Sequence, residues 1–179
     1  MLVKFTKMQG CGNDYVYVDC TKDVIDNIPE TARRVSDRHF GIGSDGLILI
    51  RTSKQADFMM DMYNYDGSRA QMCGNGIRCV AKYVYDNKLT DKKHLQIETL
   101  SGIRDLDLTV ADGKVTFVAV DMGKPVLKPS LIPVISDKEI VIKEPINVDN
   151  KIYEVTCVSM GNPHAVVFVD DTKNLPMET

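Results

Sequence analysis

The length and charge of the chain restrict the kinds of protein it can be. It has 179 residues, of which 44% are hydrophobic, so it is long enough to bury a core and too apolar for a disordered chain. The net charge of -3 comes from interspersed acidic and basic residues and offers no basic surface for a nucleic acid or an anionic membrane. We therefore expect a small-molecule or protein partner.

Membrane insertion and secretion are also disfavoured. No run of about 18 apolar residues is present, and residues 1–7 lack the segments of a signal peptide. We expect a cytoplasmic protein with reduced thiols, because the five cysteines form no C-x-x-C pair and have no secretory context. The cysteines and histidines also lack the close ligand pairs of a structural zinc site, so no metal is expected.

The first half of the chain predicts mixed α and β structure. Helix formers after a proline predict a helix at Pro29–Arg38, and a period of two over residues 58–63 predicts a strand leading into the turn Asn64–Gly67. An apolar stripe at i, i+3, i+4 and i+7 then predicts a helix from about Cys73 to Asn87. Runs of β-favouring residues predict further strands at Leu2–Phe5, Tyr15–Val18 and Leu47–Ile50.

A hairpin follows that helix. Alternating apolar residues lie on either side of Asp112-Gly113, a dipeptide typical of hairpin turns. The alternation places Val115, Phe117 and Ala119 on one face of the return strand. We expect the register of this hairpin to be well fixed.

A stretch of prolines after the hairpin predicts a domain boundary. We divide the chain into a first domain, residues 1–120, and a linker with the start of a second domain, residues 121–179. Only strand-like runs follow, with no helix to cover them, so we expect the second domain to be incomplete and the sequence to be truncated. These runs are Ile140–Ile142, Tyr153–Val158 and Ala165–Val169.

Residues 64–79 are the most informative for chemistry. They put Cys73 at the start of the predicted helix, where the first N–H groups lack partners and the macrodipole stabilises a thiolate. Gly74 and Gly76 leave room for a substrate carboxylate beside those N–H groups, and Asn75 can add a directed hydrogen bond. We predict a thiolate base next to an anion site, an arrangement suited to removing the proton from a carbon that bears a carboxylate.

Other interpretations of these segments are less specific. A lone cysteine is usually buried filler, but here glycines bracket the thiol and a polar loop precedes it, which favours function. Cys79 lies roughly 240° around the helix from Cys73, so we assign it to the core and expect no disulfide between them. Residues 41–46 match the dinucleotide pattern G-x-G-x-x-G, yet they precede a strand where that pattern opens a helix, so we interpret them as a turn.

Two shorter loops share this polar character. Residues 10–14 and residues 161–164 each place an asparagine on a glycine-shaped turn. Glycine, asparagine and proline are ordinary turn formers, so each loop alone says little about function.

Taken together, these segments resemble diaminopimelate epimerase, over nearly the whole chain and in the order of that family. The matching motifs are G-N-D at 12–14, D-R, G-I-G and D-G within 37–46, the signature at 64–79, and G-N-P-H at 161–164. The resemblance implies an α/β (α+β) fold of two pseudo-symmetric domains, each a sheet wrapped around a central helix.

The resemblance also implies an activity. The family interconverts L,L- and meso-diaminopimelate, a late step toward lysine and peptidoglycan, without pyridoxal or another cofactor. Two cysteines act on opposite faces of the α-carbon. The resemblance is also compatible with a homodimer. By this carry-over Cys73 is the first base and His164 lies near the reacting centre. The residues implied to bind substrate are Asn13, Asn64 and Asn162, with Gly74 and Asn75 on the α-carboxylate.

Some positions depart from the family pattern. Cys11, Gln9 and Tyr15 replace the usual aliphatic residue, histidine and phenylalanine, and Gly46 stands where some members use a glutamine ligand. The second catalytic cysteine belongs to a C-terminal portion that these residues lack, and Cys11 is a poor substitute. A molecule ending at Thr179 is therefore expected to have little or no epimerase activity.

Two alternatives stay open. One is a proline or hydroxyproline racemase, although those enzymes carry histidine in the position of Asn75. The other is a non-catalytic amino-acid-binding module, in which the helix start holds a carboxylate and Cys73 is a bystander.

Overall fold

A computed structural model describes residues 3–173 and 175. Contacts between Cα atoms divide the chain into two compact units, Met1–Met122 and Gly123–Thr179. The first unit contains β1 (Thr6–Gly10), β2 (Asn13–Asp19), α1 (Ile28–Ser36), β3 (Gly46–Arg51), β4 (Phe58–Asn64), β5 (Arg69–Ala70), α2 (Gly74–Asp86), β6 (His94–Thr99), β7 (Gly102–Ala111) and β8 (Lys114–Val120). The second contains a 3-10 turn at Pro129–Leu131, β9 (Glu144–Val148), β10 (Lys151–Ser159) and β11 (Pro163–Val167).

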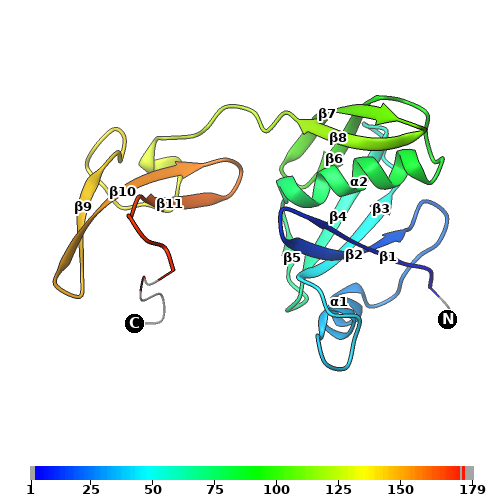
Figure 1. Cartoon of the computed structure of the whole chain (residues 1–179), viewed down its shortest axis with the longest axis horizontal. Helices are drawn as coiled ribbons and strands as arrows, with labels where there is room; N and C mark the ends of the chain where they lie inside the picture. Colours follow the sequence, from blue (N-terminus) through cyan, green and yellow to red (C-terminus); the bar gives the residue numbers. More distant parts are fainter. Residues whose placement is uncertain (1–2, 174, 176–179) are drawn as a thin grey trace. The chain divides into compact units, whose positions relative to one another are not determined.

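The first unit is a sheet curled around one helix. Its strand order is β1-β2-β3-β4-β6-β7-β8, with β5 paired to β4. The β2–β3 and β4–β6 pairs are parallel, because α1 and α2 supply the crossovers that parallel neighbours need. Helix α2 contacts β1 and β2 on one side and β7 and β8 on the other, and Figure 1 shows it lying between these strands. The predicted sheet around a central helix is confirmed.

The core lies on both faces of β3. Ile48 and Ile50 pack toward the predicted apolar stripe of α2, in which Ile77, Val80, Ala81 and Val84 are fully buried. Leu47 and Leu49 point the other way, into a smaller cluster with Ala32 of α1. A strand covered on both faces needs a continuous apolar run, which explains the sequence Leu47–Ile50. Both predicted helices are confirmed, with α1 ending two residues earlier than expected.

The hairpin of β7 and β8 has the predicted turn, but the residues of β8 that face the core differ from the prediction. Asp112 and Gly113 form the turn with positive φ. The expected common face of Val115, Phe117 and Ala119 is wrong, since Val115 is buried while the other two are exposed, Phe117 at 64%. A register shift between Thr109 and Val110 pairs them with Phe117 and Val115, so Thr116 is the extra residue of a β-bulge. Beyond the bulge, Val118 and Val120 contact the core instead.

Two predicted strands are wrong in position. The described part of the run Leu2–Phe5 is not in a strand; β1 begins at Thr6, because the tight turn between β1 and β2 aligns Gly10 with Asn13. Residues 140–142 are likewise outside any strand. The ladder forms at β9, where a turn at Asp149 and Asn150, both with positive φ, connects it to β10. Strands β5 and β6 were not predicted.

The second unit is a three-stranded antiparallel sheet in the order β11-β10-β9. The predicted strand Tyr153–Val158 is confirmed within β10, while β11 lies two residues before the expected Ala165–Val169. Its small core cluster contains Val141, Val155 and Cys157. Among the described residues, no helix is long and apolar enough to cross a membrane.

Candidate active site

Cys73 is the N-cap residue of α2, the position that the sequence predicts. Its backbone is extended, with φ of -136° and ψ of 113°, and its sulfur accepts a hydrogen bond from the Gly76 N–H at 3.3 Å. The side chain is half-buried. The N–H groups of Gly74 and Asn75 belong to the same first turn, which has no intrahelical acceptors, so a thiolate and an anion can both be stabilised here.

Glycine at position 76 allows close packing of the helix start against the sheet. A Cβ atom there would lie 2.9 Å from Cδ1 of Ile48 and 3.6 Å from the sulfur of Cys73. The absence of a side chain therefore lets the first turn of α2 sit directly on β3, with the thiol beside it.

Cys79 differs from Cys73 as expected. It is buried in the main core, and burial raises the pKa of its thiol.

Two tyrosines of β2 lie near these sulfurs. Burial raises the pKa of the Tyr15 phenol, with the Cys73 sulfur as the next cause, and the hydroxyl of Tyr17 donates to the Gly76 carbonyl oxygen at 3.4 Å. Both phenols are neutral donors beneath the helix start.

The structure brings two predicted substrate residues together beside Cys73. Asn75, in the first turn of α2, donates from Nδ2 to Oδ1 of Asn13, at the start of β2, at 2.6 Å. Arg78, one turn along α2, donates to Oδ1 of Asn75 at 2.6 Å and lies 3.4 Å from the Cys11 sulfur. On the other side, Asn13 donates to Asp45 at 3.4 Å.

Charged side chains hold the loop that carries Asn13. Arg38 makes two hydrogen bonds to the Asp14 carboxylate, at 2.9 and 3.2 Å, and Lys7 lies 3.0 Å from the same group. The Arg38 guanidinium, followed by Lys7, holds the pKa of Asp14 well below its usual range. Arg38 also pairs with Asp45 at 2.9 Å. The sequence motifs contain Asp14, Arg38 and Asp45, but spacing alone assigns these residues no role.

Asn64 lies at the end of β4, in a closed polar turn. Its Nδ2 donates to the Ser68 hydroxyl at 3.0 Å, and Ser68 in turn donates to the Asp66 carboxylate at 2.6 Å. Gly46 pairs with Asn64 across β3 and β4, and a Cβ at Gly46 would lie 2.2 Å from the Tyr63 carbonyl oxygen. The glutamine that some members have at this position therefore does not fit the present backbone.

Asn162 and His164 lie in the second unit, at the hairpin between β10 and β11. His164 Nε2 is 3.1 Å from the Oδ1 of Asn162, and both side chains are exposed. The two residues are therefore neighbours, in a hairpin whose register joins Ser159 to Pro163.

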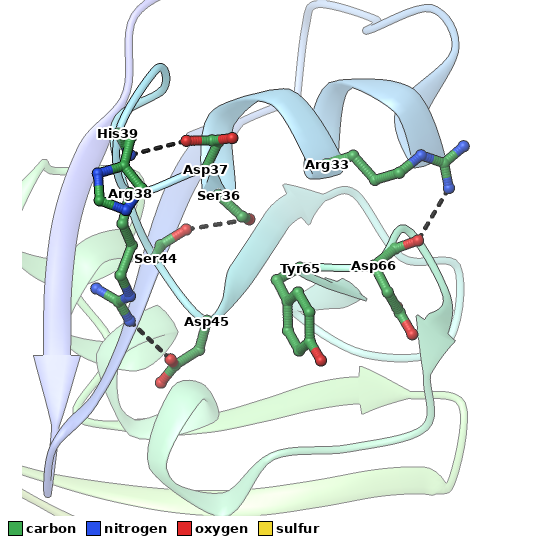
Figure 2. A pocket seen from close by; sticks show the side chains of 9 residues that line it. All are labelled: Arg33, Ser36, Asp37, Arg38, His39, Ser44, Asp45, Tyr65 and Asp66. Carbon is green, nitrogen blue, oxygen red and sulfur yellow. Dashed lines mark hydrogen bonds and ion pairs between the residues drawn. The ribbon is translucent and has the colours of Figure 1, made fainter.

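A separate cavity of about 670 Å³ lies beside α1. Figure 2 shows its lining, in which Arg38 reaches Asp45 while Arg33 bonds to the backbone oxygen of Asp66. A second cavity, of about 600 Å³, is lined by Cys11, Arg78 and parts of β8. Cys73 lines neither. Within the described residues, no group of three or more His, Cys, Asp or Glu side chains is placed to hold a metal ion.

The fold is that of racemase-like α+β proteins. The chain superposes on a probable proline racemase from Agrobacterium radiobacter K84 with a TM-score of 0.64, at 13% sequence identity, covering 93% of this chain and 52% of that one. At this identity the likeness defines the fold alone.

Sequence comparison defines the family within that fold. Residues 5–128 match the family model of diaminopimelate epimerase. The chain is 58% identical to the diaminopimelate epimerase of Acetivibrio thermocellus over 176 residues and 57% identical to that of Methanococcus maripaludis strain C5, with 98% of this chain covered in both. It belongs to the diaminopimelate epimerase family, an isomerase family, as the sequence motifs predict. The chain spans 63% and 64% of the length of these two relatives.

Proposed function

We propose that the protein acts on diaminopimelate as a pyridoxal-independent epimerase, with Cys73 as one of its two proton-transfer groups. The observation that carries this proposal is the thiol at the N-cap of α2, with the Gly76 N–H on its sulfur and a glycine-lined first turn beside it. Family membership supplies the substrate and reaction. Asn13, Asn64, Gly74 and Asn75 are proposed to bind the substrate, together with Asn162 and His164 from the second unit.

The chemistry follows from the placement of the thiol. The Cys73 thiolate takes the α-proton, and the electron pair of the broken C–H bond stays on the α-carbon and delocalises into the carboxylate. Free N–H groups at the start of α2 are suited to receive that developing charge. Inversion needs a second acid on the opposite face, whereas return of a hydrogen by the same sulfur gives exchange without inversion.

Exchange of the α-hydrogen in deuterated water therefore tests Cys73 by itself. We expect the full chain to introduce deuterium at the α-carbon of L,L-diaminopimelate, and Cys73→Ala to abolish this, as measured by proton NMR. Cys20→Ala is the matched control: Cys20 is a half-buried thiol whose pKa is raised by burial, and it packs against the smaller cluster. Unchanged exchange in Cys73→Ala would show that Cys73 is not the base, whereas absence of exchange in the unaltered chain would favour a binding module in which the thiol is a bystander.

The substrate class is tested by replacing diaminopimelate with L-proline in the same assay. Asn75, in place of the histidine typical of proline racemases, supports diaminopimelate. Exchange only into proline would overturn the assignment.

The cellular setting is part of the proposal. A small-molecule substrate and a net charge of -3 support a cytoplasmic enzyme that binds neither nucleic acid nor membrane. Assembly as a homodimer is tested by sedimentation equilibrium, and a monomer at micromolar concentration would exclude a stable dimer.

A further inference from the structure

A line of hydrogen bonds connects a cation to an anion across the candidate site. Arg78 donates to Asn75 at 2.6 Å, Asn75 donates to Asn13 at 2.6 Å, and Asn13 donates to Asp45 at 3.4 Å. We call these four residues the amide relay. Its members come from α2, from the start of β2 and from the loop before β3, and its longest-range bond joins Asn13 and Asn75, 62 residues apart.

The chemistry of its two ends gives the relay one direction. A guanidinium has only donors, so the Asn75 atom that faces Arg78 is the oxygen. A carboxylate only accepts, so the Asn13 atom that faces Asp45 is the nitrogen. Turning either amide over would place oxygen against oxygen or N–H against N–H. In a part-buried site such a mismatch leaves polar groups unsatisfied, which costs more than the hydrogen bond itself contributes.

Both ends of the relay are anchored independently. Asp45 accepts from the Asp14 backbone N–H at 3.2 Å on the oxygen that faces Asn13, and from Arg38 at 2.9 Å on the other oxygen. At the other end, Arg78 extends from the same helix that Cys73 caps, and its guanidinium also donates to the Cys11 sulfur at 3.4 Å. Each terminal charge therefore has a partner besides the two amides.

We propose that Asp45 and Arg78 are positioning residues that fix the amide orientation of Asn13 and Asn75. Each amide uses one N–H and one oxygen lone pair within the relay, so its second N–H stays available as a donor. Two oriented donors beside the start of α2 suit a carboxylate. The identity of the ligand, an amino acid bound through its carboxylate, rests on the proposed function. The relay itself rests on the hydrogen bonds of the structure.

A reversal experiment tests the direction of the relay without substrate. Asn75→Asp keeps the shape and the bond from Arg78, but it forces Asn13 to turn over and face Asp45 with oxygen against oxygen. Asp45→Asn then restores a donor opposite the turned amide. The bond from the Asp14 N–H is lost in this substitution with or without Asn75→Asp, because Arg38 keeps the remaining oxygen. We expect each single substitution to lower the thermal midpoint of the full chain by about 5 °C. In the double variant the midpoint should fall clearly less than the sum of the two single decreases. Additive losses would overturn the proposal.

The matched control pairs Asn75→Asp with Asp86→Asn. Asp86 is also bonded to a backbone N–H and a cation, namely Val115 at 2.9 Å and Lys82 at 2.8 Å. Asp86 lies 11 residues beyond Asn75 along α2, roughly 16 Å from it. The decrease in the thermal midpoint caused by Asp86→Asn should therefore add to that caused by Asn75→Asp. If the decreases in the thermal midpoint are not additive in this control pair either, the result of the reversal experiment is not specific to the relay, and the proposal is overturned.

A second arm links the relay to catalysis through the α-hydrogen exchange assay. We expect Arg78→Met to raise KM for diaminopimelate about tenfold with a smaller change in kcat, and Arg78→Lys to recover part of the loss. A fall in kcat with unchanged KM would overturn the positioning role. Absence of exchange in the unaltered chain would refute the proposed function alone, since the reversal experiment decides the relay independently.

Discussion

The two helices of the first unit begin in different ways. Helix α1 follows Asn27, a left-handed residue whose side chain makes no capping bond, and carries Pro29 and the acidic Glu30 in its first turn. Helix α2 is capped by the sulfur of Cys73, and its first turn holds no acidic residue. Helix α1 thus supplies its own negative charge to the positive end of its dipole. Helix α2 leaves that end for a thiolate and an incoming anion.

The largest expected effect comes from giving α2 an ordinary cap. In Cys73→Ser the hydroxyl still accepts the Gly76 N–H, so the free energy of unfolding should stay within about 0.5 kcal/mol of the unaltered chain. Hydrogen exchange at the substrate α-carbon should fall at least about 100-fold, because a serine hydroxyl is not ionised near neutral pH. Proton NMR and urea unfolding measure the two quantities. Retained exchange would show that the base lies elsewhere.

The next largest effect is expected on stability, at Gly46 in strand β3. Gly46→Ala should lower the free energy of unfolding by about 3 kcal/mol, since the new methyl group meets a fixed backbone oxygen. Gly74→Ala is the matched control: its Cβ would lie 3.3 Å from the flexible Met122 sulfur, and the expected loss is below about 1 kcal/mol. Equal losses in urea unfolding would contradict this explanation.

Acid should weaken the loop that faces α2. The folded-state pKa of Asp14 is lowered by Arg38 and Lys7, so its contribution to stability is complete above the unfolded pKa of about 4. It is lost as pH falls below that value toward the lower folded pKa. In Asp14→Asn the uptake of protons on unfolding near pH 3 should decrease by about one. An unchanged slope of unfolding free energy against pH would refute this assignment.

The smallest effect is expected at the start of α1. Glu30→Gln should lower the free energy of unfolding by about 0.5 kcal/mol or less, because the residue is exposed and its pair with Arg33 is solvated. Exchange at the substrate α-carbon should not change. A loss of exchange would mean that the start of α1 also affects the reaction, and would contradict the assignment of that reaction to the start of α2.

The sequence predicts the elements whose signals are local. The apolar stripe of α2 and the turn at Asp112-Gly113 are confirmed because each depends on residues within a few positions. The placement of Cys73 at the helix start follows in the same way. The family is confirmed because its motifs are ordered along the chain.

The parts that the sequence does not predict depend on distant partners. The roles proposed for Asp45 and Arg78 depend on the bonds that join Asn13 to Asp45 and to Asn75, across segments that no spacing rule connects. Strand β9 was missed because the turn at Asp149 and Asn150, and not the apolar run before it, sets the ladder. The bulge at Thr116 likewise depends on the pairing of β8 with β7, which the alternation along β8 alone does not show.

That bulge has a consequence for solubility. Strand β8 lies at the end of the sheet order, so one side of its backbone faces no neighbour within that sheet. An uninterrupted strand in this position, with an exposed Phe117, would be a template on which another chain could add and begin to aggregate. The extra residue at Thr116 breaks the row of backbone donors and acceptors and increases the local twist. An incoming strand therefore loses its register halfway along β8.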